Sequence, residues 1–192
     1  MKVLAILANH DKNSLSSRIF YQVTHHLAQN GAQVDILDLY ERQDEIPFYV
    51  GHKPDQSPTL HTSTFFHENK ERFLAADKLL IVYPIYWYAV PGILKCWFDL
   101  ITTFAWKFTG KSKTQPLHKI KHAFIINSSM ESWWHRRFLT TNPSRRQISQ
   151  TFDFIGIPNY DFYEIGSTHT LKQAQITGHI NAIIARSKKL LT

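Results

Sequence analysis

A polar loop near the start of the chain carries side chains suited to binding an anion. It follows a short apolar run, and apolar residues then recur every fourth position from Leu15 to Leu27, which is helical spacing. Unpaired N–H groups and the dipole at the start of a helix both favour negative charge. Plain helix capping by Ser14 explains the same loop equally well, and no dinucleotide-type glycine motif or Walker motif is present. The polar residues are His10, Asn13, Ser14, Ser16 and Ser17.

A second loop is rich in aromatic rings. Tyr86, Trp87 and Tyr88 stand between Pro84 and Pro91, directly after another short apolar run. Consecutive rings in a loop cannot all point into a core, so at least one is expected to face a cleft or a partner surface. Such rings can wall a flat ligand, whereas the apolar positions after Pro91 follow helical spacing and are expected to be core, with Pro91 in the first helical turn.

A third loop runs from Ser128 to His135 and also follows a short apolar run. It contains Trp133 and Trp134. All three loops therefore leave the ends of predicted strands, and in a wound α/β sheet the ligand binds at the carboxyl ends of the strands.

Five short apolar runs are expected to form strands that are buried on both faces or lie at a sheet edge. Helical patterns alternate with them, which favours a parallel sheet with right-handed crossovers. The prediction is one domain over residues 1–192, with a doubly wound sheet in the order 2-1-3-4-5 and helices on both faces. The strands are expected at Val3–Ala8, Gln33–Leu39, Leu79–Tyr83, His122–Asn127 and Tyr160–Ile165.

The helix boundaries have local signals. One helix is expected to begin at Ser57-Pro58 and end near Ala75, and another to begin at Asn142-Pro143 and end at Gly156. Thr170 and Gln173 form a predicted capping box for the last helix. The segment from Lys107 to Lys121 is polar and basic and is expected to be a loop.

Composition narrows the class of protein. The formal charge is +7, but the basic residues are scattered pairs, which is typical of a solvated surface and does not favour nucleic-acid binding. A single cysteine, Cys96, excludes an internal disulfide framework and fits a reducing cytoplasm. No apolar run is long enough to cross a membrane, and the N-terminus resembles a first strand more than a signal peptide.

An anion site beside two aromatic loops suits a ligand with a phosphate at one end and flat rings at the other, which is the shape of FMN. The segment Tyr83–Asp99, YPIYWYAVPGILKCWFD, resembles the signature of the flavodoxin-like NAD(P)H:quinone oxidoreductases (the DT-diaphorase and modulator-of-drug-activity type). Phe104-Ala105-Trp106 is similar to the segment that follows it in that family. The loop from His10 to Ser16 resembles the phosphate loop of the family, with Ser14-Leu15-Ser16 in place of its serine-aromatic-asparagine triplet.

The resemblance implies a flavin cofactor, FMN or possibly FAD, and a homodimer with its sites at the interface. It implies hydride transfer from NAD(P)H through the flavin to a quinone or similar acceptor. The short chain favours FMN. The implied cofactor-binding residues are His10, Asn13, Ser14, Leu15 and Ser16 for the phosphate, Pro84, Ile85, Tyr86, Trp87 and Tyr88 beside the rings, and Asn127, Ser128, Ser129, Met130 and Trp133 at the pyrimidine edge.

The third loop departs from the family pattern. Where the family usually has Thr-Thr-Gly-Gly, this chain has Asn127-Ser128-Ser129-Met130, and glycine is the residue that permits close backbone approach. The departure motivates an alternative function, a flavin-binding regulatory subunit on a membrane transporter with little turnover of its own. No side chain is assigned as catalytic; His10 and His135 are the two that could assist an acceptor. No metal site is expected.

Overall fold

A parallel sheet forms the centre of the protein. The computed structural model describes all residues except 50–59, 61 and 111–112. Its main sheet has five strands in the order β2-β1-β3-β6-β7, all parallel, so the predicted wound order is confirmed under a different numbering. The strands are β1 (Lys2–Leu7), β2 (Gln33–Asp38), β3 (Lys78–Pro84), β6 (His122–Ser128) and β7 (Tyr160–Ile165).

The three inner strands are buried on both faces. Residues 3–7 of β1 and 79–83 of β3 are fully buried, which is why their sequences are continuous apolar runs rather than alternating ones. Two hydrophobic clusters lie on opposite faces of the sheet. The first includes Phe73, Trp97 and Phe152, and the second includes Phe20 and Ile183.

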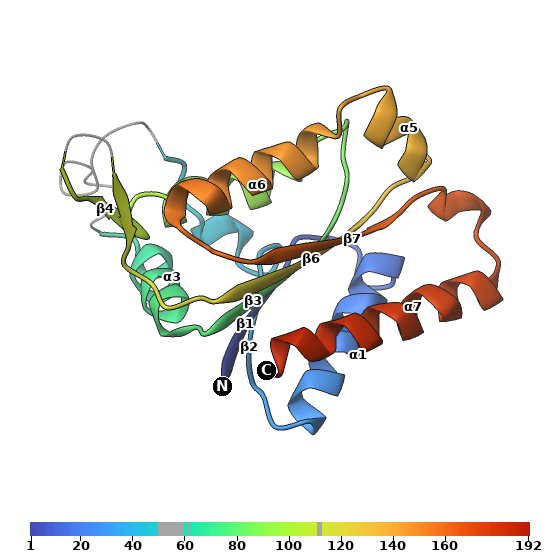
Figure 1. Cartoon of the computed structure of the whole chain (residues 1–192), viewed down its shortest axis with the longest axis horizontal. Helices are drawn as coiled ribbons and strands as arrows, with labels where there is room; N and C mark the ends of the chain where they lie inside the picture. The colour runs from blue at the N-terminus through green and yellow to red at the C-terminus, as the bar shows by residue number, and fades with distance from the viewer. Residues whose placement is uncertain (50–59, 61, 111–112) are drawn as a thin grey trace.

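Helices pack against both faces of the sheet, as Figure 1 shows. On one face lie α1 (Leu15–Gln29) and α7 (Gln173–Ser187), and on the other α3 (Thr64–Ala75), α4 (Gly92–Ile101) and α6 (Pro143–Ile155). A short helix, α5 (Trp133–Phe138), precedes α6. Single 3-10 turns are η1 (Gln43–Glu45), η3 (Thr168–Thr170) and η4 (Lys188–Leu190).

Several predicted helix ends are confirmed and others are wrong. Asn142 caps α6 with Pro143 in its first turn, and Gly156 ends it with φ +85°. Pro91, however, is the N-cap of α4 rather than a residue of its first turn. Thr170 does not begin a capping box, because it lies in η3 and Lys172 caps α7. The predicted start at Ser57-Pro58 lies outside the described residues, and α3 begins at Thr64 after its N-cap, Ser63.

The segment predicted as a polar loop from Lys107 to Lys121 is only partly a loop. It contains most of an antiparallel hairpin of β4 (Trp106–Phe108) and β5 (Thr114–Pro116). The Trp106 ring contacts Phe108 and, on α6, Phe154, at centroid distances of 4.6 and 4.7 Å. Strands of three residues have no visible alternation, so the pattern gives no strand signal.

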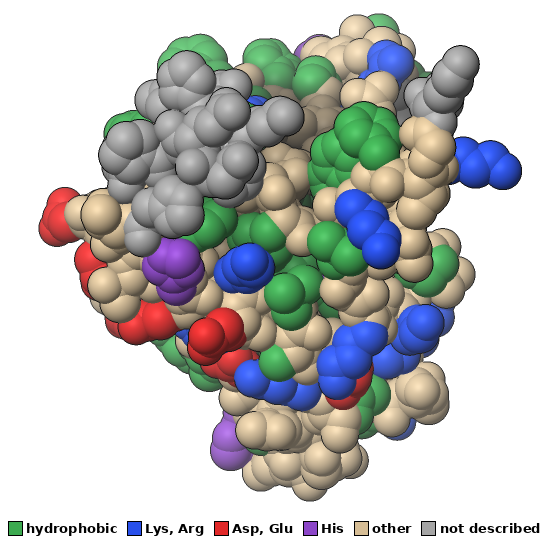
Figure 2. Space-filling model, turned by 90° about the vertical axis from the view of Figure 1, so that its left-hand side faces the viewer, with side chains coloured by type: hydrophobic (Ala, Val, Ile, Leu, Met, Phe, Trp, Pro, Cys, Tyr) green, Lys and Arg blue, Asp and Glu red, His purple; other side chains and the backbone are tan. Residues whose placement is uncertain are grey.

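The surface charge is dispersed. Figure 2 shows Lys and Arg side chains scattered over much of one face, with Asp and Glu gathered toward its left side. This arrangement is that of a solvated surface rather than one basic patch. None of the helices in the described part of the chain is long and apolar enough to cross a bilayer.

One edge of the sheet is covered by charged side chains. Arg72 of α3 donates through Nη2 to the Asp35 carboxylate at 2.6 Å and to the Ile36 carbonyl at 2.5 Å, and Lys2 Nζ lies 3.4 Å from Asp35. Asp35 and Ile36 belong to β2, the outermost strand on that side. The arginine side chain therefore takes up a backbone carbonyl of the edge strand that another strand could otherwise pair with.

His118 is expected to make stability depend on pH. Its Nε2 donates to the Ile155 carbonyl at 3.1 Å, and its Nδ1 accepts from the Ile120 N–H at 3.2 Å, so the neutral ring is the form that fits. Burial lowers the pKa of His118 below its usual value, and the charge of Lys121 lowers it further. The unfolded chain therefore binds more protons, and this contribution to stability is lost as the pH falls below about 6.5.

The measurement is urea unfolding of the wild type and of His118→Gln, from about pH 7.5 down to about pH 5.5. The wild type is expected to lose more stability over this interval than the variant, because glutamine does not titrate. Equal losses in the two proteins would contradict the assignment.

Candidate functional site

Three loops meet at the carboxyl ends of the inner strands, as the strand order predicts (Figure 1). The Oγ atoms of Ser16 and Ser128 are 2.7 Å apart in a buried hydrogen bond that joins the first and third loops. The Ile85 N–H donates to the Ser128 carbonyl at 2.8 Å, which joins the second and third. Tyr86 Oη lies 3.3 Å from His10 Nδ1, which joins the first and second. The loops thus form one rim.

The first loop holds the start of α1 open toward the rim. Ser14 caps the helix by accepting from the Ser17 N–H at 3.2 Å, and Ser17 Oγ donates to the Asp11 carbonyl at 2.7 Å. The N–H groups of Leu15 and Ser16 have no acceptor within the helix. No acidic residue lies in the first turn. The arrangement favours an anion at this helix start.

Two charged neighbours of this loop have partners of their own. Lys12 pairs with Asp38 and, at 2.9 Å, with Glu41, so its ammonium is engaged outside the loop. Asp11 accepts the Asn13 N–H at 2.9 Å. The Asn13 side chain is exposed.

The aromatic loop is a tight turn in a strained conformation. The backbones of Tyr86 and Ala89 exchange two hydrogen bonds of 3.1 and 3.0 Å, which leaves Trp87 and Tyr88 as the central residues. Their φ angles are +48° and +66°, in the left-handed region that glycine or asparagine usually occupies in such turns. The Trp87 side chain is 94% exposed, which confirms that at least one ring faces outward.

The strain at Trp87 gives a prediction. Trp87→Gly is expected to raise the free energy of unfolding by about 0.5–1 kcal/mol, because the gain from relieving a left-handed residue exceeds the entropy that glycine adds to the unfolded chain. Little burial is lost with an exposed ring. Trp87→Ala is the control, since it removes the ring and keeps the strain. Urea unfolding that ranks alanine equal to or above glycine would refute the assignment.

A cavity of about 460 Å³ lies between the second and third loops. Its size is that of a small-molecule site. Tyr88 Oη donates to Glu131 at 3.1 Å, and this bond raises the pKa of Tyr88, so the phenol stays protonated at neutral pH. Glu131 also lies 2.8 Å from His135 Nδ1. The lining residues are Ile85, Trp87, Tyr88, Ser129, Met130 and Glu131.

The third loop differs in detail from the expectation. The Ser129 N–H donates to the Ile165 carbonyl at 2.9 Å, so it is engaged with the end of β7 rather than free toward the rim. The Met130 side chain is 70% exposed beside the cavity. The loop is also shorter than predicted, because α5 begins at Trp133, whose side chain lies outside the described part of the structure.

Asn127 is fully buried beneath the rim, and its side chain accepts from Arg136. Pro84 is half-buried at the end of β3, opposite Ser128. His10 is exposed and contacts the Tyr40 ring edge-on at 5.8 Å.

Two residues of the site, Glu131 and Arg136, were not predicted. The four-residue spacing of Glu131 and His135 was the only sequence signal for Glu131, and nothing in the sequence pattern marks Arg136 as buried.

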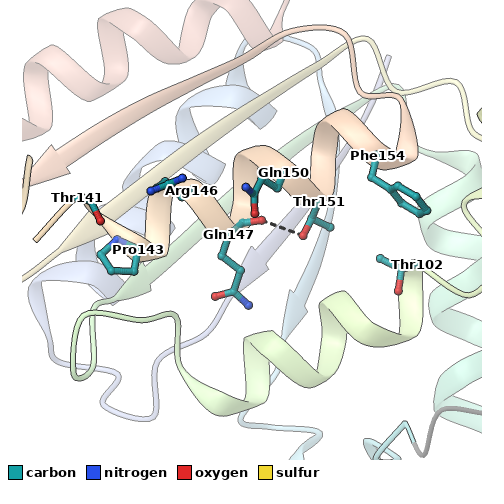
Figure 3. A pocket seen from close by; sticks show the side chains of 8 residues that line it. All are labelled: Thr102, Thr141, Pro143, Arg146, Gln147, Gln150, Thr151 and Phe154. Carbon is teal, nitrogen blue, oxygen red and sulfur yellow. Dashed lines mark hydrogen bonds between the residues drawn. The ribbon is translucent and has the colours of Figure 1, made fainter.

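A separate cavity of about 620 Å³ lies along the outer side of α6, next to the end of α4 (Figure 3). Its side chains are mostly uncharged polar groups such as Gln147, Gln150 and Thr102, with Arg146 and Phe154. None of the predicted site residues lines it. Among the residues that the structure describes, no three His, Cys, Asp or Glu side chains are grouped to hold a metal ion.

Comparison with known proteins gives a consistent picture. A family model described as "Flavodoxin-like fold" matches residues 1–187. The chain is 23% identical to the uncharacterized NAD(P)H oxidoreductase YcaK of Escherichia coli, over 69% of this chain and 67% of that protein.

Two solved structures share the fold over the full chain. An NAD(P)H:quinone oxidoreductase from Methanothermobacter marburgensis gives a TM-score of 0.81 at 19% identity, covering 100% of this chain and 98% of that one. An FMN-dependent NADH-azoreductase from Bacillus anthracis, solved with FMN, gives 0.82 at 18% identity, covering 100% and 99%. At these identities the similarity establishes the fold.

Proposed function

Because the chain belongs to the flavodoxin-like fold family, we propose that it is a flavin-dependent NAD(P)H oxidoreductase whose flavin binds at the rim. The observation that carries the proposal is the convergence of an open helix start, an aromatic turn and a cavity at the carboxyl ends of β1, β3 and β6. Two of the similar proteins are named as oxidoreductases that use NAD(P)H, and these names support the same class of reaction.

The residues at the rim fit a phosphorylated flavin. The start of α1 offers N–H groups and no acidic residue in its first turn, which suits the phosphate. The 460 Å³ cavity is walled by Trp87 and Tyr88 on one loop and by Met130 on another, which suits a flat ring. The residues at the rim therefore suit both the phosphate and the ring of a flavin.

A bound flavin supplies the hydride chemistry, accepting a hydride from NAD(P)H and passing two electrons to an acceptor. The protein supplies position and surroundings. The Ser16–Ser128 hydrogen bond fixes the distance between the phosphate end and the ring end of the site. The Tyr88–Glu131–His135 contacts hold the aromatic turn against the third loop. The apolar side chains of Ile85, Trp87 and Met130 offer a surface for a flat ring.

The finer features of the proposal have separate supports. FMN is favoured over FAD by the azoreductase solved with FMN and by the short chain. A quinone acceptor fits an open aromatic cavity and the quinone reductase among the similar structures. A homodimer in the cytoplasm fits the single free cysteine and the exposed side chains of Trp87, Phe138 and Leu139. The glycine-free loop, which motivated a regulatory alternative, still lines the cavity through Ser129 and Met130.

The test is reconstitution. The purified protein is incubated with FMN or FAD, and the affinity of each is measured by quenching of flavin fluorescence. The loaded protein is then mixed anaerobically with NADH or NADPH and afterwards with a simple benzoquinone. We expect bleaching of the flavin by the nicotinamide and recovery of its colour on adding the quinone. A protein that binds neither flavin is not a flavin reductase. Light scattering of the same sample reports the dimer.

A further inference from the structure

A buried arginine lies beneath the rim without a counter-ion. The Arg136 side chain, on α5, is 1% exposed. Its Nη1 donates to Asn127 Oδ1 at 3.1 Å, while Nε and Nη2 are buried and have no hydrogen-bond partner. No carboxylate in the described part of the chain lies within ion-pair distance of it. Buried arginines are ordinarily paired, so a charge left in this state points to a role outside folding stability.

The carboxylate and the phenol nearest to this arginine already have other partners. Tyr83, Asn127 and Glu164 stand side by side in register on β3, β6 and β7. Glu164, the nearest carboxylate of this row, accepts from Asn142 Nδ2 at 2.8 Å and lies 4.0 Å from Arg145. The hydroxyl oxygens of Tyr83 and Ser144 lie 2.7 Å apart in a buried hydrogen bond. The Asn127 amide nitrogen is buried and unpartnered, like the two arginine nitrogens.

The unpaired charge lies near the wall of the cavity. Asn127, which accepts the hydrogen bond from Arg136, stands two residues before Ser129 in the chain. Ser129, Met130 and Glu131 line the cavity. The negative charge of Glu131 is shared with His135 and with the Tyr88 hydroxyl. Arg136 is thus an ionised group near this wall with no contacting counter-ion among the described residues. Because the arginine itself is buried, little water lies around it to screen its field toward whatever occupies the cavity.

We propose that Arg136 tunes the bound flavin, favouring its negatively charged reduced form over the neutral oxidised form. The inference rests on the proposed function. When oxidised flavin takes a hydride from NAD(P)H, it gains two electrons and one proton and therefore one negative charge, while the nicotinamide leaves as NAD(P)⁺. A fixed positive charge behind the ring stabilises that product state without touching the ring. In this proposal Arg136 does not contact the flavin and acts only through its positive charge.

Two variants remove the field in different ways. Arg136→Met deletes the charge and keeps an unbranched side chain of similar reach. Asn127→Asp keeps the arginine and places a carboxylate against it, and the amide nitrogen that it replaces is one of the buried atoms without a partner. The measurements are the dissociation constant of oxidised FMN and the midpoint potential of bound FMN, titrated anaerobically against dyes.

For both variants we expect binding of reduced FMN to weaken about tenfold relative to oxidised FMN, which lowers the two-electron midpoint potential by about 30 mV. Arg136→Lys, which keeps a positive charge, and Arg186→Met, which removes an exposed arginine stacked on Tyr163, are the matched controls and should keep the wild-type potential.

The outcomes separate the two proposals. If the wild type binds no flavin, the proposed function fails and this inference fails with it. If the wild type binds FMN and Asn127→Asp has the wild-type potential, the inference alone is overturned. If Arg136→Met does not fold, the aspartate variant still decides. A loss of affinity for oxidised and reduced FMN in equal measure would mean that Arg136 is structural only.

Discussion

Ser14→Asp is expected to weaken FMN binding about 100-fold, or about 2.8 kcal/mol, while leaving the protein as stable as the wild type. Aspartate caps helices as well as serine does, and its charge suits a helix start, so α1 should remain intact. The same charge would repel a phosphate bound at the N–H groups of Leu15 and Ser16. Flavin fluorescence and thermal unfolding measure the two effects separately.

The chain offers a matched control at another helix. Ser63 caps α3 in the same way, by accepting from the Phe66 N–H at 3.1 Å, and it contributes nothing to the rim. Ser63→Asp should therefore leave both flavin affinity and stability near those of the wild type. Normal FMN affinity in Ser14→Asp would show that the phosphate does not bind at α1.

The second large effect concerns the core. Trp97 is fully buried on α4, packs against Phe73 and Phe98, and donates from Nε1 to Asn69 Oδ1 at 2.7 Å. Trp97→Ala is expected to cost about 3–5 kcal/mol, because a large cavity remains and a buried amide loses its partner. That is a large part of the stability of an ordinary domain. Urea unfolding at neutral pH measures it.

Trp97→Phe separates the two contributions. Phenylalanine fills most of the space and lacks the N–H, so we expect a loss of about 1–3 kcal/mol, mainly from the unpaired oxygen of Asn69. If the alanine variant were no less stable than the phenylalanine variant, the packing of this ring would contribute nothing, contrary to its burial.

The sheet was predictable from the sequence because its inner strands are covered on both sides. A strand such as β3, which is buried from Leu79 to Tyr83, must be apolar at every position, and this leaves a clear run between polar loops. The order of the strands followed from the alternation with helices. Ser14, Asn142 and Gly156 marked helix ends correctly because their chemistry acts locally.

The features that were missed depend on contacts between distant residues. The hairpin of β4 and β5 packs the Trp106 ring against Phe154 on α6, and no short window of sequence contains that contact. Pro91 was placed one position too far into α4, since its fixed φ suits both positions. The short helix α5 lies in a segment where tryptophans and arginines give no clean period.

At the site, the loops were predictable and their hydrogen bonds were not. The strand order predicted that the first and third loops lie at one edge of the sheet, but not that Ser16 and Ser128 meet there at 2.7 Å. Whether a backbone N–H such as that of Ser129 is free depends on the register of β6 and β7, which only the structure gives. The burial of Arg136 likewise depends on how α5 folds back over the end of the sheet.

The contact of Arg72 with the outermost strand, β2, also affects how the protein behaves at high concentration. An open strand edge invites a second chain to extend the sheet, which is the first step toward fibrils and precipitates. With Arg72 bound to the Ile36 carbonyl and Asp35 held between two cations, an incoming strand would have to displace charged, hydrated groups to pair there. A small side chain at position 72 would leave the flavodoxin-like fold in place and remove this barrier to self-association.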